Sequence, residues 1–150
     1  MNLPESFAEW CDLFDDFKNR LHDEEILKAA SMAKFDDTPI VAEMWTNEYL
    51  SAINDRIRIA QKRFDRDMTY AKGNEADIYR ALTALKRELK YIYKFADIPC
   101  CKEVEGLKDT KNIVLQAANT IENSLTESAK ADRSGKLSGL IKSIKLSDIA

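Results

Sequence analysis

The chain has 150 residues, and its 26 acidic and 23 basic side chains give a net charge of -3 at pH 7. That length predicts a single domain, and a content of 45% hydrophobic and 33% charged residues is typical of a soluble globular protein. No apolar run approaches the roughly 18 residues of a transmembrane helix, and the first residues lack the basic and apolar regions of a signal peptide, so we expect a cytoplasmic protein without a membrane span.

Two helices are predicted in the N-terminal region. Residues 1–21 repeat large apolar side chains on one helical face, and Ser6 with Glu9 has the spacing of a capping box at the helix start. Asp23 is a favourable N-cap for a second, shorter helix, because two glutamates follow it in the first turn.

A long helical hairpin is predicted next, over about residues 39–72 and 75–96. Pro39 suits a first helical turn, and no helix breaker follows until Gly73, which gives a helix on the order of 50 Å long. Gly73 is a natural residue after a helix end and Asn74 a natural N-cap. The second helix has apolar residues at alternating spacings of four and three, typical of a paired seam: Ile78, Leu82, Leu85, Leu89, Ile92 and Ala96.

One further full helix is predicted from about residue 109 to residue 130, after a break at Pro99. Residues 131–150 contain two glycines and several serines and carry a net positive charge, so we expect a flexible or weakly helical basic tail there. The predicted fold is therefore all-α: a four- to five-helix bundle built on the hairpin, with residues 1–130 as a single helical domain.

Catalytic and metal-binding patterns are weak in this sequence. The single histidine, His22, precedes an acidic run, and the spacing of Asp12 and Asp15 fits a metal-binding pair, but both aspartates lie away from the apolar face. The adjacent Cys100 and Cys101 do not have the spacing of a zinc site, and an odd count of three cysteines predicts reduced thiols. We therefore predict no catalytic, cofactor-binding or metal-binding residues and no cofactor.

Basic residues gather in the hairpin. Residues 54–95 hold 11 bases against 6 acids, a local charge of +5, whereas residues 1–37 hold 4 bases against 10 acids, a local charge of -6. In the stretch RIRIAQKRF, residues 56–64, three apolar side chains are expected to point inward and the bases to surround the helix. The candidate binding residues are Arg58, Lys62 and Arg66 on the first helix, and Lys86, Arg87, Lys90 and Lys94 on the second, with Tyr79 and Tyr93 at their margin.

Three functions are compatible with this pattern. The first is a non-enzymatic protein–protein interaction module, such as an adaptor, an inhibitor, a chaperone or an assembly subunit, whose partner is another protein or a second copy of the chain. The second is a nucleic-acid-binding accessory subunit that uses the basic face of residues 56–94. The third is a helical enzyme that depends on carboxylates and a metal, and a solvated helix face without a partner is the plain alternative to a binding surface.

Overall fold

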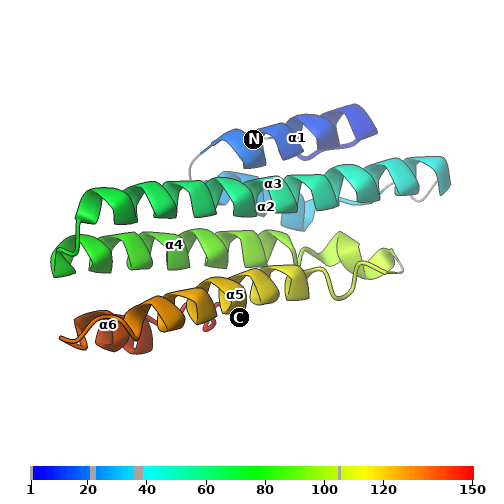
Figure 1. Ribbon diagram of the computed structural model, residues 1–150. Helices are drawn as coiled ribbons and strands as arrows, with labels where there is room; N and C mark the ends of the chain where they lie inside the picture. The colour runs from blue at the N-terminus through cyan, green and yellow to red at the C-terminus, as the bar shows by residue number, and fades with distance from the viewer. Residues whose placement is uncertain (1, 21–22, 36–38, 105) are drawn as a thin grey trace. The chain divides into compact units, whose positions relative to one another are not determined.

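The computed structural model describes residues 2–20, 23–35, 39–104 and 106–150, and its described residues form helices and no strand. The predicted all-α bundle is confirmed. Figure 1 shows the order of the helices along the chain. Their bounds are α1, Phe7–Asn19; α2, Glu24–Met32; α3, Pro39–Ala71; α4, Glu75–Phe95; a 3-10 helix η1, Pro99–Glu103; α5, Lys111–Ala129; and α6, Lys136–Ile144.

Capping side chains fix where α1 and α2 begin. The Ser6 hydroxyl accepts a hydrogen bond from the Glu9 amide at 3.2 Å, so α1 starts at Phe7, and the prediction of a helix from residue 1 was wrong. The Glu9 carboxylate accepts from the Glu5 amide at 3.2 Å, so only the Ser6 half of the predicted capping box forms. Asp23 is the N-cap of α2, as predicted, and accepts from the Glu25 amide at 3.0 Å.

The turn of the α3–α4 hairpin follows directly from its residues. Lys72 and Gly73 both have positive φ angles, 48° and 80°, and the glycine takes this conformation without the steric penalty that a Cβ brings. The Asn74 side chain then accepts from the Asp77 amide at 3.0 Å and caps α4. The predicted hairpin is therefore confirmed, with a turn of three residues.

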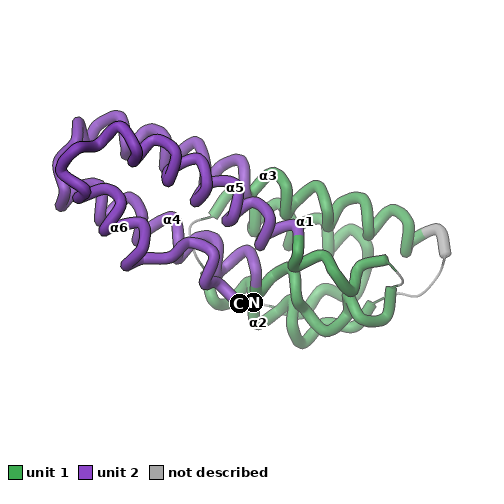
Figure 2. The backbone as a smooth tube through the Cα atoms, turned by 60° about the horizontal axis from the view of Figure 1, so that its bottom comes forward, with its two compact units in different colours: residues 1–56, 94–112 green, residues 57–93, 113–150 purple. Residues whose placement is uncertain are grey.

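The chain divides into two compact units, coloured separately in Figure 2. Unit 1 comprises residues 1–56 and 94–112, and unit 2 comprises residues 57–93 and 113–150. The core of unit 1 is a cluster of aromatic rings in which Trp45 stacks on Tyr49 at 4.7 Å between ring centroids and Phe17 stacks on Phe95 at 3.8 Å. Trp10 meets Trp45 edge-on at 5.3 Å, so α1 and α3 are joined by ring-to-ring contacts within this unit.

The core of unit 2 is aliphatic and contains the predicted seam of α4. Leu82, Leu89 and Ile92 are fully buried, and Ile78 and Leu85 are nearly so. Phe64 from α3 and Val114 and Ala118 from α5 are also buried in this unit. The Arg63 guanidinium of α3 lies 3.8 Å from the Glu88 carboxylate of α4 and links the two arms of the hairpin at the surface.

The C-terminal residues form a helix with an apolar face. Within unit 2, α6 spans Lys136–Ile144, and four aliphatic side chains of the segment are buried: Ile141, Ile144, Leu146 and Ile149. The flexibility predicted for residues 131–150 and a domain boundary at residue 130 stay predictions. None of the described helices is both long and apolar enough to span a bilayer.

Candidate functional site

The predicted basic residues differ in exposure. Arg58, Lys62 and Arg66 are exposed on α3, and Arg87 and Lys90 are exposed on α4, all in unit 2. Lys94 is exposed in unit 1. Tyr79 keeps 51% of its surface exposed, whereas Tyr93 and Lys86 are partly buried.

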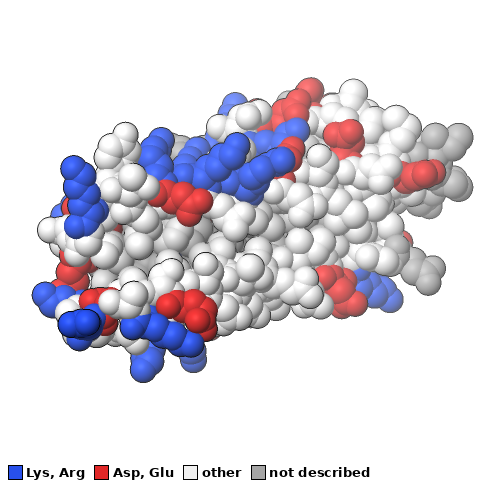
Figure 3. Space-filling view, in the orientation of Figure 1, with Lys and Arg blue, Asp and Glu red and all other residues white. Residues whose placement is uncertain are grey.

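The three basic residues of α3 form one row. Their spacing of four residues places them on successive turns, opposite the buried side chains of Ile57, Ala60 and Phe64. Figure 3 shows Lys and Arg side chains gathered over this part of α3. The Arg66 guanidinium lies 3.8 Å from the Asp67 carboxylate, an exposed pair of the kind that contributes little to stability.

Lys86 is partly buried and is hydrogen-bonded to another helix of unit 2. Its ammonium group donates a hydrogen bond of 2.5 Å to the carbonyl of Ile144, the last residue of α6. The C-terminal end of a helix carries a partial negative charge, so it offsets the repulsion that Lys86 experiences from the lysine one turn along α4. The exposed basic row of α4 therefore begins at Arg87.

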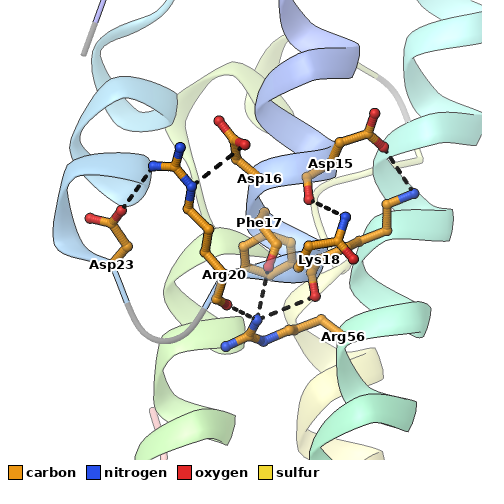
Figure 4. Close-up of polar contacts among 8 residues, drawn as sticks. Asp15, Asp16, Phe17, Lys18, Arg20, Asp23 and Arg56 are labelled. Atoms are coloured by element: carbon orange, nitrogen blue, oxygen red, sulfur yellow. Dashed lines mark hydrogen bonds and ion pairs between the residues drawn. The ribbon is translucent and has the colours of Figure 1, made fainter.

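Arg56 has a structural role that sequence reasoning missed. We expected it to flank the helix as a surface base, but its side chain is 0% exposed. One guanidinium nitrogen, Nη1, donates to the carbonyl of Phe17 at 3.1 Å and to that of Lys18 at 3.4 Å, and also to the carbonyl of Arg20 (Figure 4). The guanidinium carbon also lies 5.9 Å from the centre of the Phe17 ring.

The carbonyls that Arg56 binds are those that the end of α1 leaves unpaired. The last four carbonyls of a helix have no partner within it, and they form the negative end of its dipole. A buried guanidinium placed there satisfies several of these acceptors together, which a single-point donor does less well. Figure 4 shows the acidic side chains of this helix end in ion pairs of their own: Asp15 with Lys18 at 3.3 Å, and Asp16 with the Arg20 side chain at 3.6 Å. Asp23, the N-cap of α2, also lies 3.6 Å from the Arg20 guanidinium.

A hydrogen-bonded chain of buried groups lies in the core of unit 1. The Tyr49 hydroxyl donates to the carbonyl of Phe95 at 2.5 Å and accepts from the Cys101 thiol at 3.0 Å. Burial raises the pKa of Tyr49, and the hydrogen bond to Cys101 together with burial raises the pKa of Cys100. Both groups therefore stay protonated at neutral pH, which suits a structural role in which Tyr49 satisfies a buried carbonyl and a buried thiol.

Substituting Tyr49 tests this hydrogen-bonded chain. Tyr49→Phe keeps the ring and removes the hydroxyl that bonds the Phe95 carbonyl and the Cys101 S–H, so we expect a loss of about 1–3 kcal/mol in the free energy of unfolding. Urea denaturation measures it, with Tyr79→Phe at an exposed site as the control, for which we expect a change within about 0.5 kcal/mol. Equal free energies of unfolding for the two variants would show that these hydrogen bonds contribute nothing to stability.

The carboxylate candidates lie at the surface of α1. Asp12 and Asp15 are both exposed, and Asp15 pairs with Lys18. Among the described residues, no group of three or more His, Cys, Asp or Glu side chains could hold a metal ion. His22 lies outside the described residues.

Comparison with known proteins adds no relative to these observations. No protein-family model, no curated protein and no solved structure matches the chain.

Proposed function

We propose that this chain is a non-enzymatic protein–protein interaction module that binds an acidic surface of a partner protein through exposed basic residues of its α3–α4 hairpin. The observation that carries the proposal is the row Arg58, Lys62 and Arg66, exposed on three successive turns of α3 in a chain of net charge -3. Like charges one turn apart are mildly unfavourable in an isolated helix. An acidic partner surface offsets that repulsion and fixes the orientation of docking.

Several observations favour a protein partner over nucleic acid. The strongly acidic residues 1–37 and the negative net charge oppose the long-range attraction of a polyanion. Arg56 and Lys86 are bonded to carbonyls within the chain, which removes two cations from the count available for phosphates. The half-exposed Tyr79 is of the amphipathic aromatic type that protein interfaces favour.

A nucleic-acid-binding accessory subunit is the second candidate, supported by the same exposed bases together with Tyr79, whose ring is available for base stacking. A second copy of the chain is one source of an acidic surface, because residues 1–37 carry a local charge of -6. We propose that the protein acts in the cytoplasm, because free thiols such as Cys11, Cys100 and Cys101 persist in that reducing compartment.

Charge reversal tests the proposed surface. The triple variant Lys62→Glu, Arg87→Glu and Lys90→Glu changes three exposed residues of unit 2 and spares Lys86 and Arg56. We expect an unchanged circular dichroism spectrum and a loss of partner affinity of roughly tenfold or more, about 1.4 kcal/mol. Co-purification from the native cytoplasm, followed by titration of the purified partner, measures the loss.

A matched control carries the same change of charge elsewhere. Lys28→Glu, Lys102→Glu and Lys108→Glu alter three exposed lysines of unit 1, and we expect this variant to retain its partner. If both variants retain the partner equally, the hairpin face is only a solvated surface. Two results would favour the second candidate instead. The purified protein would show a ratio of absorbance at 260 and 280 nm typical of nucleic acid, and its affinity would fall by roughly 0.9 log units per log unit of salt for each phosphate contact on duplex DNA.

A further inference from the structure

Residues 136–150, hereafter the C-terminal strap, are held in unit 2 by polar contacts to α4 and α5. The Lys136 ammonium lies 3.9 Å from the Glu75 carboxylate at the start of α4, and the Ile144 carbonyl accepts from Lys86. The Glu122 carboxylate of α5 accepts from both the amide and the hydroxyl of Ser147, at 3.1 and 3.2 Å. Figure 2 shows α6 beside α4 within this unit.

The strap has the form of an amphipathic ligand. Ile141, Ile144, Leu146 and Ile149 are buried, whereas the polar residues between them, Lys142, Ser143, Lys145 and Asp148, are exposed. Ile141 and Ile144 are three residues apart and share one face of α6, as the anchors of a helix bound to an apolar surface do. A cavity of about 240 Å³, lined by Ile78 of α4 and Leu137 and Leu140 of α6 among others, lies at the first turn of the strap.

Within unit 2, the helix of the strap, α6, has the lowest intrinsic stability. A helix of nine residues is too short to persist alone in water, so docking must sustain it. Gly139 and two serines in its interior have poor helix propensity, and it ends at Lys145 with φ at 56°, a strained angle for a residue with a side chain. Local unfolding draws on the elements of lowest intrinsic stability in a domain.

We propose that the face of α4 and α5 beneath the strap is a docking site for an amphipathic helix of the partner protein, and that the strap occupies this site as an intramolecular competitor. The partner helix would present aliphatic side chains three residues apart and its last carbonyls to Lys86, as α6 does. The release of the strap frees Lys86, beside Arg87 and Lys90 on α4 of unit 2, to receive these carbonyls. This inference deepens the proposed function and rests on it.

The strap's own sequence is the probe that tests the site. A synthetic peptide of residues 133–150 with an N-terminal fluorescein is titrated with the full-length chain, and binding is followed by fluorescence anisotropy. In the variant Ser147→Glu, a carboxylate of the strap faces Glu122 and loosens the strap, whereas the peptide keeps its own Ser147 for that contact. We expect this variant to bind the peptide at least tenfold more tightly than the wild type.

Two further variants separate release of the strap from a general effect of charge. Ala150→Glu adds the same charge to the same segment at an exposed residue, and we expect its peptide affinity to lie within twofold of the wild type. Glu122→Lys added to Ser147→Glu restores an attractive pair, so peptide binding should return to the weak wild-type level. Equal affinity of the wild type and Ser147→Glu would overturn the proposal.

Hydrogen exchange on the unmodified chain gives a second test that does not depend on a variant that folds. If the strap opens locally, the amides of Ile141 and Ile144 exchange at least 100-fold faster than those of Leu85 and Leu89 in the seam of α4. Exchange at the same rate in both places means that the strap leaves only on global unfolding, and the proposal then fails. Neither readout uses the natural partner, so a failure of the strap and a failure of the charge-reversal experiment can be told apart.

Discussion

Replacing Arg56 by methionine is expected to lower the free energy of unfolding by about 3–5 kcal/mol, the range measured when one partner of a buried charged contact is removed. Methionine fills much of the same volume but leaves the carbonyls of Phe17, Lys18 and Arg20 without their shared donor. Urea denaturation followed by circular dichroism gives the value from the midpoint and slope of the transition.

The control for Arg56 lies on the same helix. Lys62→Met also exchanges a cation for methionine, but at an exposed position, and we expect a change within about 0.5 kcal/mol. Arg56→Lys should fall between the two, because a lysine keeps the charge and loses the planar fork of donors. A loss below about 1 kcal/mol for Arg56→Met would mean that water replaces the guanidinium at the end of α1 without penalty.

Leu89→Ala is the second substitution with a large expected effect, a loss of about 2–5 kcal/mol in the free energy of unfolding. Leu89 is 0% exposed in the seam of α4, so its truncation removes apolar contacts and leaves a cavity in unit 2. Leu85→Ala, one turn earlier and almost as deeply buried, should lose an amount in the same range. Thermal and chemical denaturation of both variants check the values.

An exposed leucine provides the comparison for the seam. Leu3 is 39% exposed, and Leu3→Ala makes the same chemical change where less area is removed from water, so we expect a loss below about 1 kcal/mol. If both seam variants lose no more than Leu3→Ala, the four-and-three spacing of α4 does not mark the surface on which its hairpin packs.

The helices could be predicted because local rules determine them. The alternating spacing of α4 identified a face that is buried in the structure, and Gly73 with Asn74 identified the turn, since both signals depend only on residues close in sequence. The start of α1 was predicted too early, at residue 1, whereas the Ser6 hydroxyl caps the helix and α1 begins at Phe7.

The roles of Arg56 and Lys86 could not be predicted in the same way. Each cation meets the C-terminal end of a helix more than 35 residues away in sequence, and only the tertiary fold brings such groups together. A weak signal for Arg56 was present: it lies three residues after Ile53 and four before Ala60, within the apolar face of α3. The prediction missed that signal because it assumed that every arginine of residues 56–64 is exposed to solvent.

The candidate binding surface was predicted only as a set of residues. The sequence grouped the two basic rows by charge, and the structure separates residues that remain exposed, such as Lys62 and Lys90, from Lys86, which is bonded to α6. The partner could not be predicted, because the chemistry of an exposed charge specifies the sign of what it attracts and little else.

Both tryptophans of the chain, Trp10 and Trp45, belong to the aromatic cluster of unit 1, and residues 57–93 and 113–150 contain none. Intrinsic tryptophan fluorescence is therefore an optical reporter of unit 1 alone, whereas far-ultraviolet circular dichroism sums the helices of both units. Recording the two signals during one denaturation of Leu89→Ala, whose lesion lies in unit 2, shows whether the units melt in one cooperative step. Coincident curves mean that both units unfold in one cooperative transition, so a defect in the aliphatic core of unit 2 also destabilises the aromatic cluster of unit 1. Separated curves mean that each unit has its own melting transition.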